Sequence, residues 1–190
     1  NEKTATAAGI DYDKTYTYLA SHATYYPGAA QMSIKALWDK KTLKIIGAQI
    51  VGFDGVDKRM DVLATAIRLG AKITDLTTFE LCYAPPFGSA KDPVNMLGFV
   101  AENIVSGKLK QFFWHDVENL PRDGSVFLLD TRTPFEVMRG KIDGFVNIPL
   151  DSLRQRINEI PKDRPVYVHC HSGLRSYLAC RILAGNGYDC

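Results

Sequence analysis

The spacing of hydrophobic residues divides the chain into two halves with different patterns. In the first half, apolar and polar residues alternate over 32–36, as in a half-buried β-strand. A polar turn at 39–42 separates this strand from an apolar stretch at 43–51, which favours a hairpin. Apolar residues recur at helical spacing over 57–69, and Gly70 stands at the expected helix end. These patterns predict an α+β domain with an antiparallel sheet and helices.

The remaining segments of the first half are predicted from their composition and their flanking residues. Residues 1–14 are expected to be irregular or the end of a helix, and the aromatic-rich stretch 15–26 is expected to be a strand. Thr74 is placed to cap a short helix over 74–81. Several prolines make 83–93 a loop, and Pro93 favours a helix over 94–105.

After Pro121 short apolar runs alternate with helical segments. The expected strands are 126–130, 145–148 and 166–169, and the expected helices are 134–139, 151–158 and 176–186. This alternation predicts an α/β domain with a parallel sheet. We therefore expect a first domain at 1–107, a linker at 108–120 and a second domain at 121–190. The aromatic cluster Phe112–Trp114 in the linker is expected to pack against one of the domains.

A single cysteine stands between the last predicted strand and the last predicted helix. Residues 166–176 read Val-Tyr-Val-His-Cys-His-Ser-Gly-Leu-Arg-Ser, with the cysteine at 170. Backbone N–H groups and the positive end of a helix dipole favour an anion at such a position. They lower the pKa of a thiol, so Cys170 is expected to be a nucleophile. His169, on the strand before it, is expected to be a satisfied core residue.

The loop after Cys170 resembles that of the rhodanese family of sulfurtransferases. Four residues separate Cys170 from Arg175, whereas the similar loop of cysteine-dependent phosphatases holds five. The resemblance implies a persulfide on Cys170, held by loop N–H groups. Arg175 would hydrogen-bond the loop carbonyls or attract an anionic sulfur donor. The implied substrate-binding residues of the loop are His171, Ser172, Gly173, Leu174 and Ser176. The shorter loop disfavours the alternative, a phosphatase or arsenate reductase of the same fold.

Two upstream segments extend the resemblance to the rhodanese family. Residues 128–136, Leu-Leu-Asp-Thr-Arg-Thr-Pro-Phe-Glu, match the opening strand of that family, and residues 140–149 match a later segment, with Lys141 where histidine is usual. Asp130 and Arg132 are expected to form an ion pair beside the site, and a substrate role for Arg132 is the alternative.

The first half resembles the dimerisation domain of the pyridine nucleotide–disulfide oxidoreductases. The matching segments are 22–28, 46–52, 57–66 and 83–95, and the last, Tyr-Ala-Pro-Pro-Phe-Gly-Ser-Ala-Lys-Asp-Pro-Val-Asn, resembles the coenzyme A disulfide reductase and NADH oxidase branch. Both halves together resemble coenzyme A disulfide reductase–rhodanese fusions, also described as NADH-dependent persulfide or polysulfide reductases. The resemblance implies a homodimer that uses FAD, NADH and coenzyme A in its intact form, with no cofactor bound by this chain alone.

Two tyrosines match functional positions of that branch. The resemblance implies that Tyr25 and Tyr83 reach across the dimer toward the partner's redox cysteine and the coenzyme A sulfur. A phenol O–H can donate to a thiolate leaving group and later help to protonate it. Tyr26 adjoins Tyr25 in the sequence and is the alternative to it. Packing at the interface is the other reading of both positions.

The composition restricts the kinds of partner that we expect for this protein. The net charge of +2 and the absence of a basic tract argue against nucleic acid or another polyanion, and no apolar run is long enough to span a membrane. The expected partners are small-molecule sulfur donors and thiol acceptors. The chain begins without Met and stops soon after its last helix, so we expect both domains to be truncated. A dimerisation and docking module with an inactive rhodanese domain is the non-enzymatic alternative.

The four cysteines show no metal-binding or disulfide spacing. We therefore expect neither a metal site nor a disulfide. A reactive free thiol indicates a reducing compartment, hence the cytoplasm. Cys82 and Cys180 are expected to be packing residues, and no role is predicted for Cys190.

Overall fold

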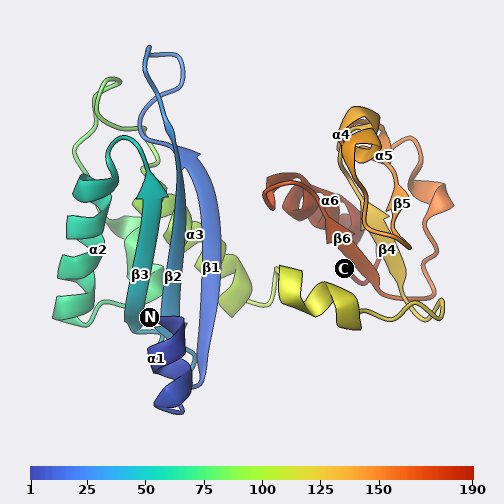
Figure 1. Cartoon of the computed structure of the whole chain (residues 1–190), viewed down its shortest axis with the longest axis horizontal. Helices are drawn as coiled ribbons and strands as arrows, with labels where there is room; N and C mark the ends of the chain where they lie inside the picture. Colours follow the sequence, from blue (N-terminus) through green and yellow to red (C-terminus); the bar gives the residue numbers. More distant parts are fainter. The chain divides into compact units, whose positions relative to one another are not determined.

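The computed structural model describes residues 1–190 and divides them into two compact units, Asn1–Lys108 and Leu109–Cys190 (Figure 1). The first unit holds a three-stranded antiparallel sheet with helices, and the second holds a three-stranded parallel sheet with helices. The predicted fold class, α+β followed by α/β, is confirmed. No helix is both long and apolar enough to cross a membrane.

The sheet of the first unit is a meander of neighbouring strands. Its strands are β1 (Tyr12–Ala20), β2 (Gln31–Asp39) and β3 (Ile45–Gly52), in the order β1-β2-β3. The predicted hairpin is therefore present as β2 and β3. The strand predicted over 15–26 ends earlier, at Ala20, because the next ten residues form a loop that contains Pro27 and Gly28, the latter with a φ of 92°.

Helices and the sheet share one core in the first unit. The helices are α1 (Glu2–Ala7), α2 (Val56–Leu69), the 3-10 helix η1 (Ile73–Thr78) and α3 (Pro93–Val105). Trp38 of the sheet, Leu63 of α2 and Leu97 of α3 are fully buried in the same cluster. Helix α3 approaches η1 so closely that a Cβ on Gly98 would lie 2.8 Å from the backbone nitrogen of Thr77. This close packing positions the loop that joins η1 to α3.

The second unit is built around a short parallel sheet. Its strands are β4 (Phe127–Asp130), β5 (Val146–Asn147) and β6 (Val166–His169), in the order β5-β4-β6. The helical elements are η2 (Trp114–Asn119), α4 (Pro134–Arg139), α5 (Leu150–Leu153), η3 (Ile157–Glu159) and α6 (Leu174–Gly185). The helix predicted over 151–158 is thus two short pieces. Helix α6 starts two residues earlier than predicted, so Arg175 lies in its first turn.

The expectation that no cysteines pair is wrong. Cys180 of α6 and Cys190 form a disulfide, with their Cα atoms 5.5 Å apart. The chain turns back after α6, and Tyr188 is buried in the core of the unit and donates a hydrogen bond to the carbonyl of Ile157. This fold-back brings Cys190 beside the helix, which the sequence spacing of the two residues does not reveal.

The aromatic cluster before β4 packs only in part. The ring of Phe112 lies 5.8 Å from that of Tyr167 on β6, as expected for a packing residue. Trp114, in contrast, is 84% exposed. Both residues belong to the second unit.

Candidate functional site

The Cys170 loop lies at the carboxyl end of β6 and leads directly into α6. The backbone N–H of Gly173 donates to the sulfur of Cys170 at 3.1 Å, and the thiol lies 3.5 Å from the hydroxyl of Ser176. The Ser176 hydroxyl also donates to the carbonyl of Gly173 at 2.8 Å, which ties the loop to the helix. Gly173 adopts a φ of 103°, a conformation that favours glycine.

The environment of the loop lowers the pKa of the Cys170 thiol. Burial alone would raise the pKa, because it disfavours the charged thiolate. The hydroxyl of Ser176 and the N–H groups of Ser176, Gly173 and Ser172 outweigh that effect by stabilising the thiolate. The side chains of His171 and Leu174 are exposed to solvent, so the loop acts on the sulfur through its backbone and Ser176.

Arg175 contacts a residue for which the sequence suggested no function. Its two terminal nitrogens donate to the two carboxylate oxygens of Glu136, each at 2.7 Å. Both nitrogens therefore donate to Glu136, and not to the loop carbonyls as one of the two predicted roles of Arg175 required. Glu136 also accepts from the N–H and the hydroxyl of Thr133, both at 2.9 Å, in a capping box at the start of α4. The Thr-x-x-Glu spacing could have placed Glu136 in the box, but not opposite Arg175.

Asp130 and Arg132 form the predicted ion pair at the end of β4. Asp130 is 2% exposed, and it accepts from Nε and Nη2 of Arg132 at 2.7–3.1 Å. The Nη2 atom of Arg132 also donates to the carbonyl of Gly140 at 3.0 Å. The pair therefore fixes the segment between β4 and β5 beside the Cys170 loop.

His169 meets its predicted role as a satisfied core residue only in part, since its Nδ1 lies 3.4 Å from the carbonyl oxygen of Cys170, within hydrogen-bond distance. The side chain is only partly buried, and its Nε2 lies 3.3 Å from Oδ2 of Asp130 without hydrogen-bond geometry. Its ring meets that of Phe145 edge-on at 4.6 Å. Burial lowers the pKa of His169, and the nearby Asp130 offsets this effect only in part.

The two predicted tyrosines meet in the first unit. Tyr25 lies in the loop between β1 and β2, Tyr83 lies in the loop between η1 and α3, and their phenol oxygens are 2.8 Å apart. Tyr25 is 74% and Tyr83 is 49% exposed. The hydrogen bond with Tyr83 raises the pKa of Tyr25. Tyr26 packs edge-on against His22 instead, so the structure brings Tyr25, not its neighbour, to Tyr83.

A buried arginine holds the two tyrosine loops together. Arg59 of α2 is 1% exposed, and its Nη2 donates to Asp92 at 2.7 Å and to the carbonyl of Ser21 at 2.6 Å. Ser21 starts the loop of Tyr25, and Asp92 ends the loop of Tyr83 and caps α3 through the N–H of Val94. The helical pattern of 57–69 does not reveal this role of Arg59, because an arginine in an amphipathic helix is usually exposed.

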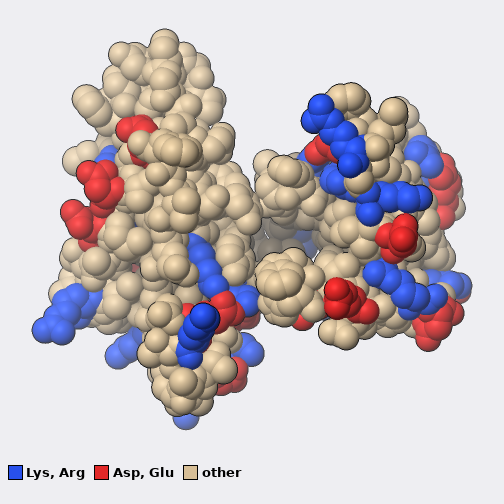
Figure 2. All heavy atoms as spheres, viewed as in Figure 1, with Lys and Arg blue, Asp and Glu red and all other residues tan.

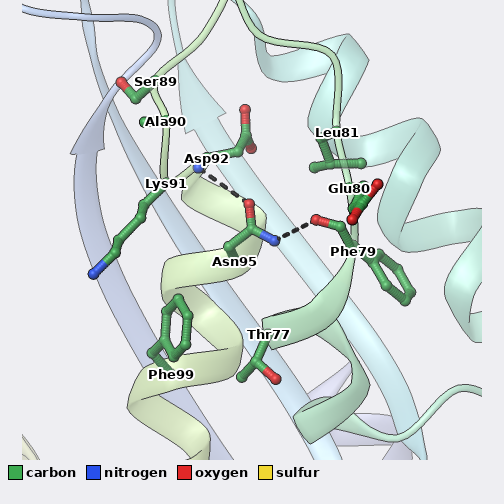
Figure 3. Close-up of a pocket in the computed structure, with 10 residues that line it drawn as sticks. All are labelled: Thr77, Phe79, Glu80, Leu81, Ser89, Ala90, Lys91, Asp92, Asn95 and Phe99. Carbon is green, nitrogen blue, oxygen red and sulfur yellow. Dashed lines mark hydrogen bonds between the residues drawn. The ribbon is translucent and has the colours of Figure 1, made fainter.

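The loop of Tyr83 also borders a hollow of about 310 Å³ between η1 and α3 (Figure 3). Asn95 lies at its centre, where its amide donates to the carbonyls of Leu76 and Phe79 and its oxygen accepts from the N–H of Asp92. Asn95 thus braces the loop, and both N–H groups of its amide are already used within the protein. The expectation that Cys82 packs inside is wrong, since this residue is exposed.

Charged side chains are few at the end of the first unit that carries the loop between β1 and β2, at the top of Figure 2. Several large apolar or aromatic side chains of the unit are exposed instead: Tyr25, Tyr26, Phe53, Tyr83 and Phe87. On the rest of the face shown in Figure 2, basic and acidic side chains are interspersed on both units. No group of three or more His, Cys, Asp or Glu residues is arranged to hold a metal ion.

Known proteins match each unit separately. Residues 1–93 match the pyridine nucleotide-disulphide oxidoreductase dimerisation domain, and residues 114–190 match the rhodanese-like domain. The coenzyme A disulfide reductase of Staphylococcus epidermidis is 41% identical over 93 residues, which are 49% of this chain and 21% of that protein. The chain therefore spans about a fifth of the length of the curated relatives that it matches.

Two solved structures resemble the chain over almost its full length. The crystal structure of reduced Bacillus anthracis CoADR-RHD is 46% identical, with a TM-score of 0.93, and the match covers 100% of this chain and 34% of that one. The structure of a NAD-dependent persulfide reductase from A. fulgidus is 38% identical, with a TM-score of 0.83, and the match covers 99% and 33%.

These matches and the geometry define a reductase dimerisation domain followed by a rhodanese-like domain. Residues 1–93 carry the dimerisation domain of the pyridine nucleotide-disulphide oxidoreductases and residues 114–190 a rhodanese-like domain. In this order of domains the chain is similar to part of the CoADR-RHD and persulfide reductase structures.

Proposed function

We propose that the second unit is a sulfurtransferase in which Cys170 carries a persulfide. The observation that carries the proposal is the lowered pKa of a thiol that accepts a backbone hydrogen bond from Gly173 at the mouth of a four-residue loop. A thiolate is the species that attacks sulfur, so this environment favours the reaction at neutral pH.

The chemistry needs no external oxidant. The Cys170 thiolate attacks the terminal sulfur of a donor R–S–S⁻, a new S–S bond forms, and the donor leaves as R–S⁻ with the electron pair of the broken bond. The terminal sulfur of the resulting persulfide would be held by N–H groups of residues 171–175. A thiol acceptor then removes this sulfur by the same exchange in reverse. Asp130 and Arg132 would hold the neighbouring segment in place during both steps.

We propose that the first unit forms a homodimer and contributes Tyr25 and Tyr83 to reduction of the transferred sulfur or of a coenzyme A disulfide. Their shared hydrogen bond at 2.8 Å and their exposure support a pair that meets a partner surface. One phenol can donate to a departing thiolate while the other holds it in place. The low charge and the exposed aromatics around these loops fit a surface that is covered in a dimer.

In the intact protein, bound FAD and NADH would supply the reducing electrons, as the family implies. Neither unit offers a Gly-rich turn between a strand and a helix that would cradle a dinucleotide, so the residues described do not fit these groups. Coenzyme A would serve as a thiol acceptor, reaching the protein as a substrate.

Cyanide-dependent sulfur transfer tests the central proposal. We expect the full protein to form thiocyanate from cyanide and an organic persulfide or a polysulfide. The rate with Cys170→Ser should fall to the uncatalysed rate. Cys82→Ser, which removes the other free thiol, is the matched control and should keep full activity. Retained transfer in Cys170→Ser would show that this cysteine is not the carrier.

A further inference from the structure

Carboxylates neutralise both arginines beside the Cys170 loop. Glu136 accepts from both terminal nitrogens of Arg175, each at 2.7 Å, and Asp130 accepts from Arg132 at 2.7–3.1 Å. The two pairs are neighbours, since Arg132 directly precedes Thr133, whose N–H and hydroxyl both donate to Glu136. The four side chains therefore form a cluster with no net charge.

The charge of this cluster matters because sulfur donors differ in charge. Thiosulfate is a dianion, and its attack by the Cys170 thiolate breaks the S–S bond and expels sulfite, which carries two negative charges. An organic persulfide R–S–S⁻ carries one charge and expels a singly charged thiolate. An unpaired cation near the sulfur would attract the dianion more strongly than the monoanion. A cluster with no net charge would give the dianion no such advantage.

We infer that Glu136 is a specificity-determining residue that directs Cys170 toward singly charged organic persulfides and away from thiosulfate by keeping Arg175 paired. This inference rests on the proposed function of Cys170.

The contacts of Glu136 suit this role. The N–H and the hydroxyl of Thr133 hold the carboxylate in the capping box of α4, so its position does not depend on Arg175 alone. The side chains of Arg175 and Glu136 are each 30% exposed, so a small anion could reach the guanidinium if the carboxylate were absent. A planar guanidinium can then bind two oxygens of such an anion.

The competing reading is that Glu136 only braces the loop. Loss of a brace would slow sulfur transfer from every donor by the same factor, because it would disturb Cys170 itself. Loss of a charge would instead change the ratio of the rates for the two donors. The ratio therefore separates a role in specificity from a structural role.

The test measures the rate at which Cys170 gains one sulfur atom, a mass increase of about 32 Da, with thiosulfate and separately with cysteine persulfide. In Glu136→Gln of the full protein, we expect the thiosulfate rate to rise relative to the persulfide rate by roughly tenfold, the size of one added charge on a partly screened site. Glu136→Asp keeps the charge and should keep the preference of the unmodified protein.

Glu159→Gln is the matched control. Glu159 forms a bidentate pair with Arg156 in the same unit, with both distances 2.7 Å, and this pair does not involve the Cys170 loop. Glu159→Gln removes the same charge from the unit and should leave the ratio of the thiosulfate rate to the persulfide rate unchanged. An unchanged ratio in Glu136→Gln, or an equal change in Glu159→Gln, would overturn the inference.

Salt provides a readout that needs no variant. In the unmodified protein, added salt should speed the thiosulfate reaction by screening the repulsion between the dianion and the Cys170 thiolate. A rate that falls steeply with salt would show that an unpaired cation attracts the donor and would overturn the inference even if Glu136→Gln did not fold. Absence of a sulfur adduct with either donor would instead contradict the proposed function.

Discussion

The two units secure their reactive loops with the same chemical device in different surroundings. In the first unit, Arg59 and Asp92 hold the two tyrosine loops, and their side chains are 2% and 4% exposed. In the second unit, Arg175 and Glu136 join the Cys170 loop to α4, and their side chains are each 30% exposed. Burial decides what such a pair does. A buried pair cannot lose one partner without leaving an uncompensated charge, whereas an exposed pair is partly solvated and can influence a nearby reaction instead.

The two sites also differ in how far apart in the sequence their parts lie. Tyr25 and Tyr83 are 58 residues apart, and their loops are joined by Arg59 of α2 and by a backbone hydrogen bond from the N–H of Ala23 to the carbonyl of Gly88. The parts of the second site are close in the sequence. The contacts of Cys170 are with Gly173 and Ser176, three and six residues further along the chain. The first site therefore depends on the tertiary fold, and the second depends mainly on local backbone geometry.

Among the predicted changes, Asp92→Ala should have the largest effect, a loss of unfolding free energy in the first unit. It leaves the buried Arg59 unpaired and removes the cap of α3, so we expect the unit to lose about 3–5 kcal/mol of unfolding free energy. Urea unfolding followed through the buried Trp38 would report it, with Trp114→Phe as the background to remove the second tryptophan. Asp11→Ala, which breaks an exposed pair with Lys40 in the same unit, is the control and should cause no comparable loss. Equal effects of the two variants would contradict the importance of burial.

Reduction of the Cys180–Cys190 disulfide should have the next largest effect, confined to the second unit. Opening a loop of this length costs about 2–3 kcal/mol by the chain-entropy model. We expect a reductant to lower the thermal midpoint of the second unit in the unmodified protein. The midpoint of Cys190→Ser should not change with reductant, because that variant has no disulfide to reduce. Equal shifts by reductant in both proteins would show that the disulfide is not the cause.

Ser176→Ala should shift the chemistry of the second unit without unfolding it. The hydroxyl helps to lower the pKa of Cys170 against the opposing effect of burial, so its removal should raise that pKa. The thiolate would then form at higher pH, and alkylation of Cys170 at neutral pH should slow severalfold. The measurement is the rate of iodoacetamide labelling against pH, with Cys82 in the same sample as an internal reference. An unchanged pH profile would contradict the role of Ser176.

Glu136→Gln should have the smallest effect on stability. Its pair with Arg175 is partly exposed, and such pairs contribute little to folding. We expect the unfolding midpoint of the second unit to stay close to that of the unmodified protein, in contrast to the effect of Asp92→Ala on the first unit. A loss as large as that of Asp92→Ala would remove the distinction between the two pairs.

The sequence predicts the elements of this fold well and its tertiary contacts poorly. Periodicity identifies α2 and the strand β6, and the position of Cys170 between a strand and a helix predicts the activated thiol. The Asp130–Arg132 pair could also be predicted, because its members lie two residues apart. The contact between Glu136 and Arg175 could not, since 39 residues separate them and nothing local requires it. The burial of Arg59 and the pairing of Cys180 with Cys190 depend likewise on how distant segments pack.

The most direct test of the account is to locate transferred sulfur on the protein. After incubation with cysteine persulfide, peptide mass spectrometry should find a gain of about 32 Da on the peptide that contains Cys170 and none on the peptide that contains Cys82. A thiol acceptor should then remove the added sulfur. Sulfur spread equally over both cysteines, or found on Cys82 alone, would contradict the claim that the loop makes Cys170 the carrier.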